Sequence, residues 1–250
     1  LILQYENQKN NYLKQESSDM ERRTFLRNSL LTAGGVLFGG SAIFRFLKES
    51  KPEEDFRPTT VETICQGNGK NVLVLMSAGT RQGNTDHLTD AYIKGLSEKG
   101  HSVTKVYLGS MRMAGCRGCG ACQRNGNRCA VQDDMQRLYP LFAACDTLVM
   151  ASPLYFWTIT ARLKSFIERL YAISVEDKYP EKETVLLMTA GDNSEHTFDQ
   201  ALGYFHIISG VLGGKEVGTY LAGGCTGCEN IARQIAPEHL EKVYKMGLEL

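Results

Sequence analysis

The 250-residue sequence has no excess of either charge, because 28 Lys and Arg residues balance 28 Asp and Glu residues. Without an excess of positive charge, no long-range field attracts nucleic acid or an anionic membrane. We therefore expect no nucleic-acid partner. Two nucleotide-binding motifs are also missing: no G-x-G-x-x-G follows the first predicted strand, and no G-x-x-x-x-G-K-[ST] occurs anywhere. Their absence argues against a dinucleotide-binding Rossmann site and a P-loop.

The histidine and cysteine residues argue against a histidine metal site and against a disulfide-built fold. The five histidines show no metal-ligand spacing, and none is predicted to act as a base. Eight cysteines are too few for a disulfide scaffold at this length, and four of them lie within residues 115–129. With 42% apolar residues, the chain can bury one substantial core, so we expect one folded domain.

Residues 20–49 have the order of a signal peptide: a charged start, an apolar run rich in Gly and Ala, and then charged residues. The apolar run covers only about 15 residues, fewer than the roughly 20 that span a bilayer. Arg22 and Arg23 resemble the twin-arginine motif read by the Tat translocase, which exports folded proteins. We expect a periplasmic or other extracytoplasmic location. The alternatives are a chance arginine pair on a cytoplasmic protein and an uncleaved signal that tethers the protein to the membrane.

Two segments flank this signal. Residues 1–19 are polar, which predicts a disordered or upstream extension. Residues 50–69 are mostly charged and polar and contain Pro52 and Pro58, which predicts a linker. We therefore expect the folded domain to cover residues 70–250.

Within residues 70–250, apolar runs typical of buried strands alternate with segments of helical period. The predicted strands lie at 71–79, 101–108, 146–152, 183–191 and 215–223. The predicted helices lie at 88–99, 135–144, 160–172, 197–213 and 237–250. This alternation predicts an α/β fold with a doubly wound five-stranded parallel sheet. Ligands of such sheets bind beyond the carboxyl ends of the strands, so the loops there are candidate sites.

The loop after the first predicted strand can form a phosphate nest. It offers hydroxyls, an amide and flexible glycines at a helix start, with one arginine as an optional charge. The alternative is an ordinary polar turn in which Asn84 or Thr85 caps the helix. The candidate residues are Ser77, Gly79, Thr80, Arg81, Asn84 and Thr85.

Two later loops complete the edge of the sheet. The loop after the third strand carries three consecutive aromatics, which a flat ligand, a partner subunit or a neighbouring loop of the same chain would cover. The loop after the fourth strand ends in small and polar groups. The candidate residues are Pro153, Leu154, Tyr155, Phe156 and Trp157 in the former, and Thr189, Ala190, Gly191 and Asp192 in the latter.

The cysteine loop 115–129 follows the pattern C-x-x-C-x-x-C-x6-C, with Cys116, Cys119, Cys122 and Cys129. Cysteines at two-residue gaps can turn around one small inorganic body, as in [4Fe–4S] ligation. Neighbouring arginines favour thiolates. A zinc site, a lost cluster, and free or oxidised thiols remain the alternatives. A second C-x-x-C, Cys225 and Cys228, is either a redox dithiol or a pair without a special role.

Three stretches carry a resemblance to a known family: "SAGTRQGNT", "GCRGCGACQRNGNRCAVQDDM" and "ASPLYFWTITARLKSFIER". Together they resemble the flavodoxin-like NADPH-dependent FMN reductase family, particularly its iron–sulfur flavoprotein branch. The resemblance implies a homodimer with FMN near the subunit boundary. It also implies that Ser77, Arg81, Asn84 and Thr85 hold the FMN phosphate. By the same resemblance, residues 153–157 and 189–192 contact the flavin ring, and the cysteines of loop 115–129 hold a [4Fe–4S] cluster.

Three functions follow from this reading. In the first, an FMN-dependent oxidoreductase passes electrons between a reduced donor and an acceptor through FMN and the cluster. The donor is NAD(P)H or a ferredoxin-type redox partner protein, and the acceptor is a protein or a small molecule. The second function is a two-electron NAD(P)H-dependent quinone or small-molecule reductase without a cluster. The third is a flavodoxin-type electron carrier, which the neutral net charge disfavours.

Overall fold

The computed structural model describes residues 61–176, 178–227 and 232–250. The predicted extension at 1–19 and the predicted signal peptide at 20–49 lie outside these residues. Within the described ranges, no helix has both the length and the apolar character that a membrane crossing requires.

The core of the fold is a sheet in the order β1-β3-β2-β4-β5-β6. Strands β2 to β6 run parallel to one another, which confirms the predicted α/β fold with five parallel strands. The order β3-β2-β4-β5-β6 is that of flavodoxin-like folds. The bounds of these strands are Asn71–Met76 for β2, Ser102–Tyr107 for β3, Thr147–Pro153 for β4, Lys182–Thr189 for β5 and Gly214–Ala222 for β6.

A sixth strand, β1 (Val61–Cys65), corrects the predicted sheet of five. It pairs antiparallel with β3, with Val61 opposite Val106 and Thr63 opposite Thr104. These residues lie within the predicted linker 50–69, because the nearby prolines and charges obscure a strand of only five residues. Its β-branched residues suit an edge strand, and an antiparallel edge on a parallel sheet is common.

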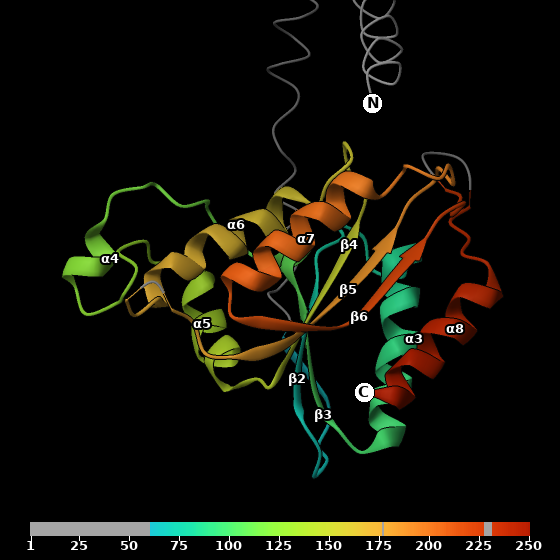
Figure 1. The fold of residues 1–250 in the computed structure, drawn as a ribbon, viewed down its shortest axis with the longest axis horizontal. Helices are drawn as coiled ribbons and strands as arrows, with labels where there is room; N and C mark the ends of the chain where they lie inside the picture. The colour runs from blue at the N-terminus through green and yellow to red at the C-terminus, as the bar shows by residue number, and fades with distance from the viewer. Residues whose placement is uncertain (1–60, 177, 228–231) are drawn as a thin grey trace, which may run out of the picture. The chain divides into compact units, whose positions relative to one another are not determined.

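Helices cover both faces of the sheet (Figure 1). One face carries α3 (Asn84–Lys99) and α8 (Pro237–Glu249). The other face carries α5 (Met135–Ala144), α6 (Ala161–Arg169) and α7 (Asp199–Val211). Successive strand residues point to opposite faces, so Leu73 and Leu75 belong to one core while Val72 and Val74 belong to the other.

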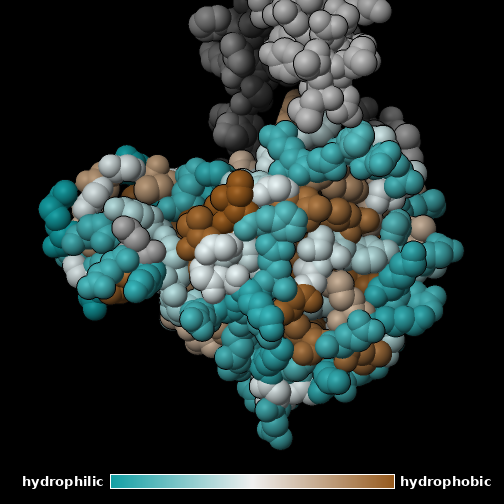
Figure 2. Space-filling view, viewed as in Figure 1, coloured by the Kyte–Doolittle hydropathy of each residue, from teal (hydrophilic) through white to brown (hydrophobic). Residues whose placement is uncertain are grey.

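Three short helical segments complete the described fold: η1 (Leu108–Ser110), α4 (Ala121–Arg124) and η2 (Leu170–Ile173). The cysteine loop that contains α4 projects from the side of the sheet domain (Figure 1). Figure 2 shows that mainly hydrophilic side chains cover this projection. The projection lies between β3 and α5 in the chain.

Glycines allow α3 and α8 to pack at very short distance. A Cβ atom on Gly95 would lie 2.3 Å from the carbonyl oxygen of Tyr244, and one on Gly247 would lie 2.4 Å from the carbonyl oxygen of Tyr92. Real Cβ atoms do not approach backbone oxygens so closely, so the two helices would have to separate. The contact between these helices therefore requires glycine at both positions.

We predict that Gly95→Ala lowers the free energy of unfolding by about 1–3 kcal/mol, because overpacking outweighs the gain in helix propensity. The matched control is Gly203→Ala in α7, where an added Cβ meets nothing within 4 Å. That change is expected to raise the free energy of unfolding by about 0.5–1 kcal/mol. Urea unfolding followed by circular dichroism measures both, and equal stability of the two variants would contradict the packing account.

Candidate functional site

A pocket of about 460 Å³ opens where β2, β4 and β5 end. All three predicted loops contribute to it, so residues far apart in sequence meet at one edge of the sheet. The pocket lies beside β2, the strand at which the strand order reverses, as expected for ligand sites of this fold. The lining residues are Ala78, Thr80, Gly83, Asn84, Thr85, Pro153, Leu154, Tyr155, Thr189, Ala190, Gly191, Cys225, Gly227 and Arg233.

The start of α3 leaves backbone donors free for an anion. Gly83 is the N-cap, and no side chain of the described residues caps the helix. The alternative in which Asn84 or Thr85 caps the helix is therefore not what the structure shows. Uncapped N–H groups at a helix N-terminus, together with the helix dipole, favour a phosphate group.

Asn84 and Thr85 connect this helix start to neighbouring loops. The Nδ2 group of Asn84 donates to the carbonyl oxygen of Thr226 at 2.7 Å, and the hydroxyls of Thr85 and Thr189 lie 2.7 Å apart. The Oδ1 atom of Asn84 is buried and has no hydrogen-bond partner among the described residues. Because buried acceptors are normally satisfied, this oxygen is a candidate acceptor for a donor from outside the described residues.

An ion-pair network links β3 to the start of α3 and to the loop that precedes it. The buried ammonium group of Lys105 lies 2.6 Å from the carboxylate of Asp86 and also contacts Asp90. Burial alone would lower the pKa of Lys105, but hydrogen bonds to the two carboxylates raise it above its ordinary value. Asp86 also accepts a hydrogen bond from the backbone N–H of Gln82 at 2.7 Å. Lys105 thereby neutralises a carboxylate that would otherwise repel an anion at the helix start.

Three residues of the predicted phosphate loop do not line the pocket. Ser77 is buried and donates its hydroxyl hydrogen to the carbonyl oxygen of Ala151 at 2.9 Å. Gly79 lies outside the pocket lining. The guanidinium of Arg81 turns toward β1, 3.3 Å from Glu62 and 3.9 Å from the ring centroid of Tyr107. The reason is β1 itself, since this unpredicted strand supplies the carboxylate that pairs with Arg81.

Arg233, which is not among the predicted site residues, contributes a cation to the pocket. Its Cδ atom lies 3.6 Å from the position that a Cβ on Gly83 would take, so its stem passes the N-cap of α3. Backbone pairing between Thr226 and Gln234 brings it there. The only sequence signal was its place after the last strand, whose end also reaches this edge of the sheet.

The aromatic loop divides into two parts. Tyr155 lines the pocket, whereas Phe156 and Trp157 form the tip of a tight turn closed by Tyr155 and Thr158. Phe156 and Trp157 have φ angles of 48° and 60°, a region that bulky residues rarely adopt. Their exposed fractions are 93% and 60%, so the alternative in which a neighbouring loop of the described chain covers them is not what the structure shows.

In the third loop, Thr189, Ala190 and Gly191 line the pocket, but Asp192 does not. The carboxylate of Asp192 accepts hydrogen bonds from Ser194 at 2.6 Å and from Thr197. The hydrogen bond from Ser194, followed in size by that from Thr197, lowers the pKa of Asp192. Asp192 therefore organises the loop rather than facing the pocket.

Cys225 of the second C-x-x-C lines the pocket, which the sequence did not indicate. It is buried, and burial raises the pKa of its thiol. A protonated thiol is a poor nucleophile, so Cys225 acts as a small apolar contact. Its predicted partner, Cys228, lies outside the described residues.

A second cavity, of about 150 Å³, is lined by Cys116, Cys119, Cys122 and Cys129. The cysteines therefore gather around one space, as their spacing predicts, and every cysteine of the described ranges is a free thiol. Even so, no group of three or more His, Cys, Asp or Glu residues in these ranges is arranged to hold a metal ion. The fold brings the four thiols to one cavity without arranging them as a metal-binding group.

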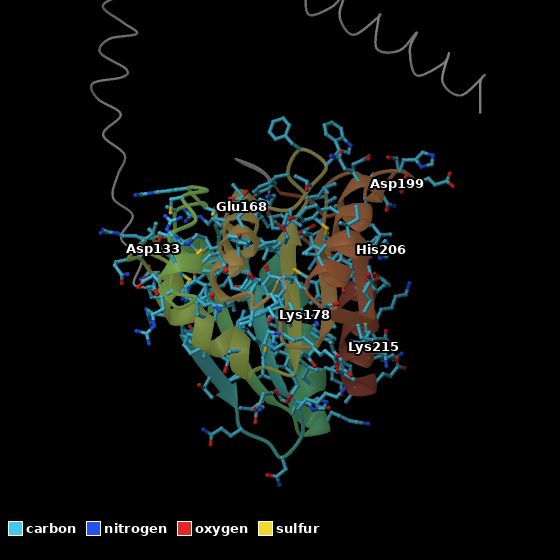
Figure 3. The ribbon with its side chains drawn as sticks, turned by 60° about the vertical axis from the view of Figure 1, so that its left-hand side comes forward. Asp133, Glu168, Lys178, Asp199, His206 and Lys215 are labelled. Atoms are coloured by element: carbon cyan, nitrogen blue, oxygen red, sulfur yellow. The ribbon has the colours of Figure 1, made fainter. Side chains whose placement is uncertain are left out.

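Asp133 closes the base of the cysteine loop. Its carboxylate accepts hydrogen bonds from the guanidinium of Arg169 at 2.9 and 3.0 Å and from the backbone N–H of Ala114 at 3.0 Å. The position of Asp133 is labelled in Figure 3. Burial alone would raise the pKa of Asp133, but the hydrogen bonds from Arg169 and Ala114 outweigh it and lower the pKa below its ordinary value. The ionised carboxylate thus ties the start of the loop to its end.

We predict that Asp133 stabilises the protein at neutral pH and that this contribution is lost as pH falls below about 4, through its lowered pKa. Asp133→Asn should lower the stability at neutral pH. It should also reduce the further decrease in stability as the pH falls. The matched control is Asp199→Asn, whose carboxylate lies on the surface beside His196. Thermal unfolding measured across this pH range checks the prediction, and parallel profiles for Asp133→Asn and the parent protein would contradict it.

Comparison with known proteins agrees with this geometry. The model of the family described as NADPH-dependent FMN reductase matches residues 71–225. An iron–sulfur flavoprotein of Archaeoglobus fulgidus is 28% identical over 177 residues, which cover 69% of this chain and 75% of the relative. An iron–sulfur flavoprotein of Methanosarcina thermophila is 30% identical over 95 residues, which cover 38% of this chain and 49% of the relative.

Solved structures show the same fold at low identity. The NAD(P)H:quinone oxidoreductase from Methanothermobacter marburgensis superposes with a TM-score of 0.55 at 16% identity, over 72% of this chain and 96% of that protein. An FMN-dependent NADH-azoreductase from Bacillus anthracis, solved in complex with FMN, has a TM-score of 0.53 at 14% identity, over 72% of this chain and 97% of its own. These similarities support the flavodoxin-like architecture.

The strand order and the pocket at its switch point define a flavodoxin-like α/β protein built to bind a mononucleotide. Because the family model matches more than half of the chain, the protein belongs to the NADPH-dependent FMN reductase family. It is therefore a flavin-dependent oxidoreductase. The expectation of a pure electron carrier does not agree with this membership.

We predict that Arg233→Gln weakens FMN binding about tenfold, since a charge-assisted hydrogen bond to phosphate contributes roughly 1.5–3 kcal/mol and exposure reduces that value. Arg81→Gln is the matched control, because Arg81 pairs with Glu62 instead of lining the pocket. Quenching of FMN fluorescence on titration gives both affinities. A larger loss for Arg81→Gln than for Arg233→Gln would restore the sequence-based assignment.

Proposed function

We propose that the protein passes electrons between a reduced donor and an acceptor through FMN and a [4Fe–4S] cluster. The donor is NAD(P)H or a ferredoxin-type protein, and the acceptor is a redox partner protein or a small molecule. The observation that carries this proposal is the single cavity lined by Cys116, Cys119, Cys122 and Cys129. The names of the archaeal relatives, iron–sulfur flavoproteins, support the same reading.

The residues of the large pocket fit FMN. The uncapped N-terminus of α3 and the cation of Arg233 suit the phosphate group, and the orphaned Oδ1 of Asn84 suits a hydroxyl donor of the ribityl chain. The side chains of Leu154 and Tyr155 offer apolar surface to a flat ring. Bound FMN supplies hydride and single-electron chemistry, while these side chains bind and orient it.

The cysteine loop fits a cluster in its donor set and its backbone. Thiolates are the usual ligands of iron–sulfur clusters, and the C-x-x-C-x-x-C spacing is typical of them. Gly118 and Gly120 have φ angles of 63° and 62°, which let the chain turn tightly between the cysteines. Residues Cys116, Cys119, Cys122 and Cys129 would hold the cluster, which supplies one-electron transfer when bound.

Helix α6 connects the two sites within one chain. Thr160, its N-cap, follows the aromatic loop, and Arg169, its last residue, lines the cysteine cavity. Nine residues at a rise of about 1.5 Å each give a helix about 13 Å long. A rigid element of this length fixes the relation between the flavin pocket and the cysteine cavity.

The second candidate is a two-electron NAD(P)H-dependent quinone or small-molecule reductase without a cluster. The absence of a metal-binding arrangement among the described cysteines favours it. The structural similarity to a quinone oxidoreductase extends over the fold alone, so it does not distinguish the two candidates. Iron content does.

We predict that anaerobically purified protein contains about four iron atoms and one FMN per chain, with absorbance around 400 nm that bleaches on reduction. Cys116→Ser or Cys129→Ser should remove most of the iron while FMN remains bound. The matched control is Cys65→Ser. Cys65 lies on β1, outside the cysteine cavity, and its thiol hydrogen-bonds with the hydroxyl of Ser97 and the carbonyl oxygen of His101. An iron-free parent protein that still oxidises NAD(P)H would favour the second candidate.

We further propose a homodimer with FMN near the subunit boundary. The exposed rings of Phe156 and Trp157, held in a strained turn beside the pocket, support this arrangement, because a partner subunit would bury them. Light scattering coupled to gel filtration checks it. A monomer at micromolar concentration would contradict it.

We also propose export by the Tat translocase, supported by Arg22 and Arg23 before an apolar run. With residues 20–60 fused to a reporter that is active only when exported folded, Arg22→Lys with Arg23→Lys should abolish the signal. The matched control is Arg27→Lys, a basic residue outside the pair. Persistent signal in the double variant would contradict export by this route.

A further inference from the structure

Arg169 is an unusual residue to find at the cysteine cavity. It ends α6, its side chain is only 1% exposed, and it lines the cavity together with the four cysteines. Arginine is rarely buried unless its charge is paired and its donors are satisfied. The contacts of its guanidinium therefore show what the side chain is positioned to do.

Four of the five N–H donors of Arg169 have partners. Nη1 donates to the carbonyl oxygen of Ala114 at 3.0 Å and to Asp133 at 2.9 Å. Nη2 donates to the carbonyl oxygen of Val131 at 3.2 Å and to Asp133 at 3.0 Å. These bonds use both hydrogens of each terminal nitrogen. The fifth donor, Nε–H, is buried and has no partner among the described residues.

An unsatisfied buried donor is costly, so an acceptor is expected where the side chain meets the cavity. Cysteines bound to a metal cluster would be thiolates, and their sulfur atoms would then be acceptors in this cavity. Neither Asp133 nor Glu168, the carboxylates bonded to residues 114 and 116 of the loop, is placed for this role. Asp133 already receives two of the other donors, and Glu168 accepts from Lys164 and from the backbone N–H of Cys116.

We infer that Arg169 is a positioning residue for the cluster, with Nε–H donating to a cluster or cysteine sulfur, and that the Arg169–Asp133 pair sets the reduction potential. This inference rests on the proposed cluster. With a cluster bound, four thiolates would leave the site net negative, and one-electron reduction would make it more negative. A buried positive charge favours the reduced form, and a buried negative charge disfavours it.

The pair therefore gives two variants with opposite expected effects. Arg169→Gln removes the positive charge and leaves Asp133 unpaired, so the reduction potential should fall. Asp133→Asn leaves the positive charge of Arg169 uncompensated, so the potential should rise. A purely structural clamp would not produce opposite signs, since both changes loosen the same loop.

The test is a redox titration of the anaerobically reconstituted full chain, followed by electron paramagnetic resonance, with iron content measured on every variant. We expect a lower potential for Arg169→Gln, a higher one for Asp133→Asn, and little change for Arg137→Gln, an exposed arginine of α5. Arg169→Lys keeps the charge and should lie closer to the parent protein than Arg169→Gln. If Arg169→Gln does not fold, Arg169→Lys still tests the role of Arg169 in setting the potential.

Unchanged potentials, or shifts of the same sign, in variants that retain iron would overturn the inference and leave the proposed cluster intact. Loss of iron from Arg169→Lys and Asp133→Asn, with the remaining cluster at the parental potential, would also overturn it and assign the pair a structural role. A parent protein that takes up no iron would instead overturn the proposed cluster itself.

Discussion

Parallel hydrogen bonding between β2, β4, β5 and β6 is the constraint on which the site depends. The register places Met76 beside Ala151, Pro153 beside Thr189, and Thr189 beside Ala222, so the strands end at nearly one level. Loops that leave the sheet there must meet. The pocket is therefore a consequence of strand pairing, and its lining residues need no contact with one another in sequence.

Charge around the pocket is arranged to accept an anion with little help from strong cations. Backbone N–H groups and the dipole of α3 provide positive potential, Lys105 cancels the carboxylate of Asp86, and Arg233 adds an exposed cation. The cysteine cavity follows a different principle. There a fully buried arginine, bound to Asp133 and two backbone carbonyls, organises a loop that has little regular structure of its own.

Patterns that act locally were predictable from the sequence. The buried strands are continuous apolar runs, α3 ends at Gly100 in a left-handed conformation, and α5 has the predicted bounds. Nine of the fifteen predicted pocket residues line the pocket, because a residue that follows a parallel strand in sequence lies at the carboxyl edge of the sheet.

Pairings between distant residues were not predictable. The sequence gives no sign that Arg81 meets Glu62 on an edge strand, that Arg233 returns to the start of α3, or that Arg169 closes a loop beginning near residue 114. Each depends on tertiary geometry. The turn at Phe156 and Trp157 was missed for another reason: bulky residues at positive φ contradict local preference, and such conformations concentrate at functional sites.

We infer that this sheet edge binds a flavin mononucleotide by its phosphate. Isothermal titration of flavin-free protein with FMN and with riboflavin, which lacks the phosphate, tests this inference. We expect micromolar or tighter binding of FMN and at least about tenfold weaker binding of riboflavin, because riboflavin offers no anion to the helix start and Arg233. Equal affinities for the two flavins, or no binding of either, would contradict it.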